Sequence, residues 1–194
     1  TLSDGATLTV GTGGSGAPTI TSVSGTASGT ASNLTLNTTG TASVGAVGTD
    51  LGTVTVTQSG GTTFSSTVDA ATVAITDTAD SQAVTFSDNL TLTSGLTVSN
   101  GGSDNYNIVL NGASNSIAGT TTFAQGGTLT LGDGTGDATD FVGGMVATEP
   151  SGITAQGTVK SDGGTGSLTL GDANTGLSVA GDLTVGGTST GAIS

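Results

Sequence analysis

The chain has 194 residues, 36 of them Gly and 42 Thr, and 14 acidic side chains against a single Lys give a net charge of −13. Phosphate backbones and anionic membrane surfaces are bound by clustered Lys and Arg, so this charge argues against nucleic-acid and membrane-surface partners. The sequence has no His or Cys. Nucleophilic triads and thiol chemistry are therefore absent, and we predict that the protein is not an enzyme.

The N-terminal stretch, residues 1–48, carries the weakest pattern in the chain. Between residues 11 and 31 the apolar signal thins to Ile20 and Val23 among Gly, Ser, Thr and Ala. We interpret 1–48 as a looser arm or as edge coils, and we expect this arm to insert into a neighbouring subunit. Residues 49–194 form the predicted main domain, in which the apolar pattern is dense. No apolar run approaches the roughly 20 residues of a membrane span, so we predict no membrane insertion.

A triplet of apolar residue, Thr and apolar residue recurs along the whole chain. Each copy runs within a few residues into Gly, Asn or Asp, which predicts a very short β-strand followed at once by a turn. One face of such a strand is apolar and the other is hydroxylated. The copies are residues 8–10, 34–36, 54–56, 84–86, 90–92, 96–98, 129–131, 168–170 and 183–185. Helical periodicity is almost absent, so we predict essentially no helix.

Two longer phrases also recur, which indicates an internal repeat. The phrase at 63–66 returns in similar form at 85–88, and the phrase at 129–133 returns at 168–172. We interpret the first spacing as one coil and the second as two coils of roughly 20 residues.

The predicted fold is all-β, a β-solenoid of short strands similar to a parallel β-helix. Such a fold stacks coils so that each strand buries its apolar side, and it places small residues at the corners. The alternative is a pair of tandem β-sandwich domains. Sandwiches need longer strands and usually a large aromatic side chain in each core. With four Phe, one Tyr and no Trp in the chain, those cores would be thin, so the composition favours the solenoid.

A glycine-rich loop offers a candidate metal site. Asp133, Asp137 and Asp140 all lie in the run 132–140. Ca²⁺ takes six to eight oxygen ligands, and Gly residues allow backbone carbonyls to supply some of them. The competing interpretation is that these Asp side chains cap turns by accepting backbone N–H groups. Weaker candidates are Asp77 with Asp80, and Asp162 beside a Gly pair. Thermal destabilisation by a chelator would support calcium, which is the only cofactor that the sequence suggests.

The strings 128–134 and 179–185 resemble the repeat units of very large secreted bacterial β-strand-repeat proteins. Filamentous-haemagglutinin-like adhesins and autotransporter passengers are similar in style. The resemblance implies an extracellular, elongated protein with a structural or adhesive role, and it transfers no catalytic residue. Absence of Cys fits an exposed bacterial product of this kind.

We therefore expect a structural subunit or segment of an extracellular bacterial fibre or surface layer. Nothing in the sequence resembles a cap for a solenoid end, so end-to-end or strand-addition contacts between copies of the chain are expected. One alternative is an adhesin stalk or binding module of a giant secreted protein that recognises glycan or a cell surface. Another is an ice-binding solenoid, because Thr-x-Thr recurs at residues 7–9, 53–57, 91–93 and 128–130. Against it, the coil spacing is too irregular to predict one uninterrupted flat array.

Overall fold

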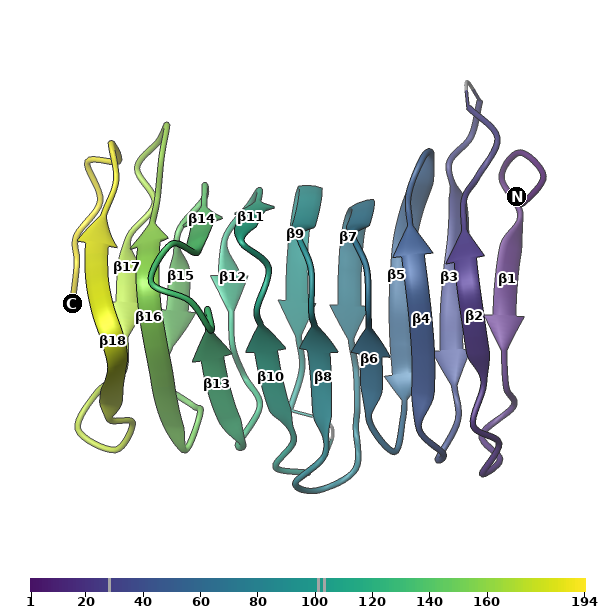
Figure 1. The fold of residues 1–194 in the computed structure, drawn as a ribbon, viewed down its shortest axis with the longest axis horizontal. Helices are drawn as coiled ribbons and strands as arrows, with labels where there is room; N and C mark the ends of the chain where they lie inside the picture. The colour runs from purple at the N-terminus through teal and green to yellow at the C-terminus, as the bar shows by residue number, and fades with distance from the viewer. Residues whose placement is uncertain (28, 101, 103) are drawn as a thin grey trace.

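The computed structural model describes residues 1–27, 29–100, 102 and 104–194. It is a parallel β-solenoid of about eight turns, with the first turns at one end of the long axis and the last turns at the other (Figure 1). All strand pairs are parallel, and the described residues contain no helix. The predicted all-β solenoid is confirmed, and the tandem-sandwich alternative is not what this chain forms.

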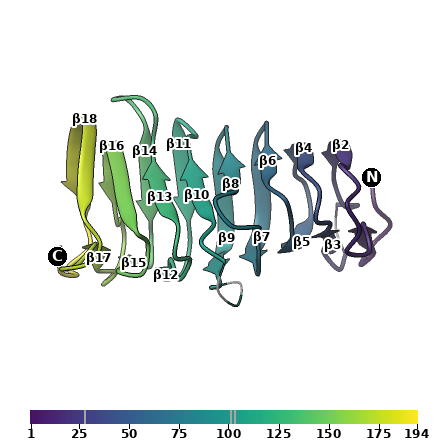
Figure 2. The same cartoon turned by 90° about the horizontal axis from the view of Figure 1, so that it is seen from below.

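Three faces, defined by strand pairing, surround the core. Face 1 comprises β1 (Thr7–Val10), β3 (Ser32–Asn37), β5 (Leu51–Gln58), the second halves of β7 (Val68–Ile75) and β9 (Leu90–Val98), β12 (Thr121–Thr122), β15 (Met145–Ala147) and β17 (Leu168–Leu170). Face 2 comprises β2 (Thr19–Val23), β4 (Ala42–Val47), β6 (Thr62–Phe64), β8 (Ala83–Phe86), β10 (Asn107–Leu110), β13 (Thr128–Leu131) and the first halves of β16 (Gly152–Lys160) and β18 (Leu177–Gly186). Face 3 comprises the ends of β2 and β4, the first halves of β7 and β9, β11 (Ser114–Ile117), β14 (Ala138–Phe141) and the second halves of β16 and β18. Figure 2 shows the same stack from below.

The register fixes the length of each turn. On face 1, Leu34 pairs with Val54 and Val54 pairs with Val73, so these two turns are nearly equal in length. The first turn, in which Leu8 pairs with Leu34, is longer than either of them. Strand pairing is nevertheless continuous, because the extra residues lie at the corners between faces.

The core is built from the apolar residues of the triplets. Alternate strand residues point inward, and the inward aliphatic side chains are fully or almost fully buried from β3 to β17. Each buried Leu or Val contributes roughly 1.5–3 kcal/mol. Phe64 and Phe86 stack in adjacent turns with ring centroids 4.8 Å apart, whereas Phe123 and Phe141 meet edge to face at 5.9 Å.

At one sharp corner the chain requires Gly. In β16 the chain passes from face 2 to face 3 at Gly157, whose φ is +81°. A Cβ atom at this position would lie 2.3 Å from the carbonyl oxygen of Asp137 in the turn beneath. Residues with a side chain strongly disfavour this backbone region, so Gly157 is required by both conformation and space.

The triplets are confirmed as strands. Of the two recurring phrases, which we call echoes, the one at 63–66 and 85–88 is confirmed as a repeat of one turn. All nine triplets lie in strands, and the Thr at the centre of each is exposed or half-buried. Thr63 and Phe64 pair with Thr85 and Phe86, so the spacing between these two phrases is one turn.

The interpretation of the second echo, from 129–133 to 168–172, as two turns is wrong. β13 lies on face 2, and Leu129 pairs with Ile153. β17 lies on face 1, and Leu168 pairs with Met145. The two similar sequences therefore lie on different faces and do not stack on each other. The similarity arises because the same strand-and-turn sequence can form on either face.

Residues 1–48, which the sequence sets apart, form β1 to β4. β1 pairs with β3 and β2 pairs with β4, and the register continues into the following turns. The half-buried Leu8, Val10 and Ile20 pack against the core. In this structure the segment supplies the first coils of the same solenoid.

Candidate functional surfaces

Face 1 presents a row of mainly Thr side chains, which we call the central row. Its members occupy the outward position at the centre of each strand, one per turn, and adjacent members are register partners. They are Thr9, Thr35, Thr55, Ala74, Thr97, Thr122, Val146 and Thr169. None of them is buried. Because strands lie about 4.8 Å apart, the row repeats at that spacing along the solenoid.

Charged side chains are segregated from two of the three faces. In the described part of the chain, no strand segment of face 1 or face 2 contains Asp, Glu or Lys. Face 3 carries Asp69, Asp140 and Lys160, and the remaining acidic residues lie at corners and in loops. The acidity of the chain is thus concentrated on one face and at the edges.

The single Lys connects two turns on face 3. Lys160 Nζ donates a hydrogen bond of 2.6 Å to Asp162 Oδ2 and lies 3.9 Å from Asp140 Oδ2 on the preceding turn. The hydrogen bond to Asp162 raises the pKa of Lys160, and the same bond, with the backbone N–H of Thr188, lowers the pKa of Asp162. Because the side chains are about one-third exposed, this pair contributes little to stability.

The predicted calcium loop is held by hydrogen bonds. Asp137 Oδ2 accepts the backbone N–H groups of Asp133 at 2.9 Å and Gly134 at 2.7 Å, which is the turn-capping arrangement. Asp140 lies on β14, where its Oδ1 accepts the backbone N–H of Asp162 at 3.0 Å. Across the described residues, no group of three or more acidic or His side chains is placed to hold a metal ion. Calcium at Asp133, Asp137 and Asp140 stays a prediction.

A second acidic group surrounds Asp77. Burial raises the pKa of Asp77, and the nearby charges of Asp104 and Asp80 raise it further. Its Oδ1 atom is buried and has no hydrogen-bond partner among the described residues. Burial and the charge of Asp77 also raise the pKa of Tyr106, whose hydroxyl donates to the carbonyl oxygen of Ser99. The sequence singled out Asp77 and Asp80 but not Asp104 or Tyr106, which the coil brings in from the next turn.

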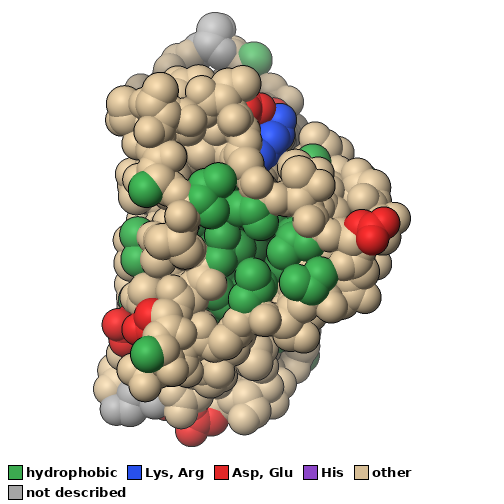
Figure 3. Space-filling model, turned by 90° about the vertical axis from the view of Figure 1, so that its left-hand side faces the viewer, with side chains coloured by type: hydrophobic (Ala, Val, Ile, Leu, Met, Phe, Trp, Pro, Cys, Tyr) green, Lys and Arg blue, Asp and Glu red, His purple; other side chains and the backbone are tan. Residues whose placement is uncertain are grey.

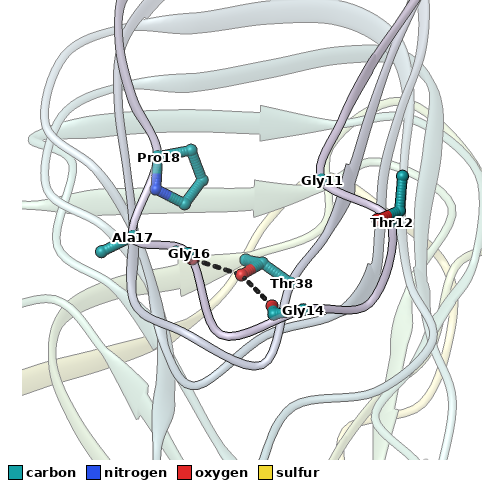
Figure 4. Close-up of a pocket in the computed structure, with 7 residues that line it drawn as sticks. All are labelled: Gly11, Thr12, Gly14, Gly16, Ala17, Pro18 and Thr38. Atoms are coloured by element: carbon teal, nitrogen blue, oxygen red, sulfur yellow. Dashed lines mark hydrogen bonds between the residues drawn. The ribbon is translucent and has the colours of Figure 1, made fainter.

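An open hollow near the first turns is built from a glycine-rich loop (Figure 4). Its volume is about 380 Å³, and it is lined by Gly11, Thr12, Gly14, Gly16, Ala17, Pro18 and Thr38. The Thr38 hydroxyl reaches the carbonyl oxygens of Gly14, at 2.9 Å, and Gly16. None of these described lining residues is ionisable, so the hollow offers no group for acid–base chemistry.

Asn side chains connect successive turns, which sequence reasoning missed. Asn33 Oδ1 accepts the backbone N–H of Thr53 at 2.9 Å, and Asn89 Oδ1 accepts that of Ser114 at 2.8 Å. Asn115 is buried, and its Oδ1 accepts the N–H of Leu90. Asn33 and Asn89 begin formal glycosylation sequons, but their amides already bridge turns. The available signal was an Asn beside the first apolar residue of a strand.

The outermost turn exposes apolar side chains at one end of the solenoid. Leu177, Val179 and Ile193 are 39%, 55% and 57% exposed, and Leu183 and Val185 are partly buried and pack against the core. Figure 3 views this end and shows the hydrophobic side chains gathered at its centre, surrounded mainly by backbone and uncharged side chains, with a blue and a red charged side chain just above the patch. The patch is the cross-section of the core.

Comparison with protein-family models, curated proteins and solved structures finds no match. Within the described ranges, no helix is long and apolar enough to cross a membrane.

Proposed function

We propose that the protein is a structural, non-enzymatic segment of an extracellular bacterial fibre or surface layer that assembles end to end with copies of itself. The observation that carries this proposal is the apolar cross-section on the outermost turn. Leu177, Val179 and Ile193 continue the inward columns of the core but have no turn above them in the described structure. Exposed contiguous apolar surface of this kind is typical of interaction sites.

The opposite end offers a partner of the same chemistry. β1 pairs only with β3, and β2 only with β4, so both strands have one free edge in the described structure. Leu8, Val10 and Ile20 lie at this end and are half-buried. A contact between two different ends is heterologous and does not close, so it generates a filament. Free strand edges add main-chain hydrogen bonds to that contact.

The magnitudes predict assembly that depends on concentration. Burying a fully exposed aliphatic side chain contributes roughly 1.5–3 kcal/mol. Leu177, Val179 and Ile193 are already about half-buried, so each adds about half of that. Association costs about 4–15 kcal/mol of lost translational and rotational freedom. Apolar contact between the three side chains alone therefore does not offset this cost, and backbone pairing decides whether a junction forms.

Electron microscopy of the purified chain over a range of concentrations tests this function. We expect regular filaments whose length increases with concentration. Val179→Asp places a charge in the apolar end and should abolish them, whereas Thr130→Asp, on the outside of face 2, should not. Monomeric rods at every concentration, or equal loss in both variants, would overturn the proposal.

A further inference from the structure

We propose that face 1 is an ice-binding surface, with the central row of Thr side chains as its principal contact. This inference is independent of filament assembly, because it concerns the flank of the solenoid. The row runs without a break in register from Thr9 to Thr169. Ice is a lattice of regularly spaced water molecules, so a rigid protein row with a constant repeat is the kind of surface that can match it.

The structure removes the argument that turn lengths are too irregular for such an array. Turns on face 1 differ in length, and the turn from Leu8 to Leu34 is longer than the turn from Val54 to Val73. The differences are accommodated at the corners and by register shifts near the ends of the β3–β5 pairing, while the residues of the central row stay paired. The repeat along the row is therefore the strand spacing of about 4.8 Å at every turn, whatever the sequence spacing.

A second, parallel row lies two positions before the central row. It contains Thr7, Thr53, Thr72, Thr120 and Ser167, and Asn33, Gly95 and Gly144 occupy the other turns. Two steps along a strand span about 6.7 Å. Face 1 thus carries hydroxyl groups on a two-dimensional grid. Thr-x-Thr pairs lie within β1 and β5, and Thr120, just before β12, forms a third pair with Thr122.

The chemistry of the two rows suits ordered water. A Thr side chain offers a hydroxyl that can occupy a water position and a methyl group beside it. Ala74 and Val146, which interrupt the central row, keep a methyl group at that position. A charged side chain would hold its own hydration shell and disturb the lattice. In the described part of the chain, face 1 has no charged side chain although the net charge is −13.

Face 2 is the internal comparison, because it has a similar central row but a poorer second row. The outward residues at the centre of its strands are Thr19, Ser43, Thr63, Thr85, Val109, Thr130, Thr154 and Ser178. Two positions earlier the turns present Ala17, Thr41, Gly61, Ala83, Asn107, Thr128, Gly152 and Gly176. The second row of hydroxyl groups is therefore sparser on face 2, which holds only Thr41 and Thr128 there, and face 2 supplies matched control positions.

A protein partner fits face 1 less well than ice does. Protein interfaces concentrate their binding energy in Trp, Tyr and Arg side chains. The outward strand positions of face 1 hold none of these residues. At the ends of β3 and β5, Asn37, Thr57 and Gln58 line an open hollow of about 670 Å³, which lies beside the central row and not under it. A ligand with its own repeat is the partner that matches a repeating surface.

The experiment measures partition of the full 194-residue chain into slowly growing ice, together with the shape of single ice crystals in its presence. Two double variants are compared at equal concentration, after circular dichroism confirms folding. Thr97→Lys with Thr122→Lys alters the central row of face 1, and Thr85→Lys with Thr130→Lys alters the same position on face 2. A third variant, Thr97→Val with Thr122→Val, keeps the methyl groups.

We expect the unmodified chain to enter ice and to shape crystals. The face 1 Lys variant should lose at least about tenfold in partition, which corresponds to 1.4 kcal/mol. The face 2 Lys variant should retain partition, and the Val variant should lose less than the face 1 Lys variant. Exclusion of the unmodified chain from ice, equal losses on both faces, or binding to crystalline chitin or cellulose in place of ice would overturn the proposal. Filament formation in any variant leaves this result unaffected.

Discussion

The interior turns and the outermost turn of the solenoid are built from the same kind of strand but bury very different fractions of it. Leu131 in β13 and Val179 in β18 belong to one inward column of face 2, with Ala155 between them. Leu131 is 1% exposed and Val179 is 55% exposed. The strand sequences do not explain this difference. Burial in a solenoid comes from the turns on either side, so stability is shared between neighbours.

The largest expected effect follows from removing a core side chain in an interior turn. Phe86→Ala leaves a cavity and removes the ring stack with Phe64, so we expect the free energy of unfolding to fall by about 3–5 kcal/mol. Val179→Ala, in the outermost turn, should cost less than about 0.5 kcal/mol. Urea unfolding followed by circular dichroism measures both. Equal costs would mean that the outermost turn is buried in solution, for example within a filament.

Much of this fold could be predicted because each strand is encoded by the same short local pattern, an apolar–Thr–apolar triplet followed by a turn residue. The triplets marked strand positions correctly, and the echo of 63–66 at 85–88 indicated the length of one turn. The echo of 129–133 at 168–172 misled because outward Thr and inward Leu suit every face equally, so similar phrases need not stack. Only the pairing register distinguishes the faces. Because the number of residues at the corners varies, that register cannot be deduced from spacing in the sequence.

The candidate surfaces were harder to predict for the same reason. The Thr-x-Thr pairs were visible, but residues 91 and 93 belong to face 3 and residues 128 and 130 to face 2, so they do not form one row with Thr7 and Thr9. The central row of face 1 draws single Thr residues from strands that are unequally spaced along the chain. No local motif encodes that alignment. Asp77 and Asp104 come from successive turns and likewise share no motif.

A smaller effect is expected at the Gly residues that turn corners, again contrasting an interior turn with the outermost one. Gly157→Ala introduces a Cβ atom 2.3 Å from the carbonyl oxygen of Asp137 at a φ of +81°. The conformational cost alone is about 1–2 kcal/mol. Gly176, just before β18, has open space around its Cβ position, so Gly176→Ala should stay within about 0.5 kcal/mol of the unmodified chain. Comparable destabilisation in the two variants, measured by urea unfolding, would contradict the geometry at Gly157.

The smallest expected effect is a change in the pH dependence of stability at Asp77, which faces Asp104 and Asp80 in the interior turns. Burial raises the folded-state pKa of Asp77 above its unfolded value of 3.8. Between these two pKa values the folded state binds more protons than the unfolded state, so stability falls as pH rises through the folded pKa. Asp77→Asn cannot ionise. Its melting temperature should match that of the unmodified chain near pH 3 and exceed it increasingly as pH rises, up to a plateau. Asp133→Asn removes the same charge from an exposed loop, and a similar gain there would assign the effect to net charge instead of to burial of Asp77.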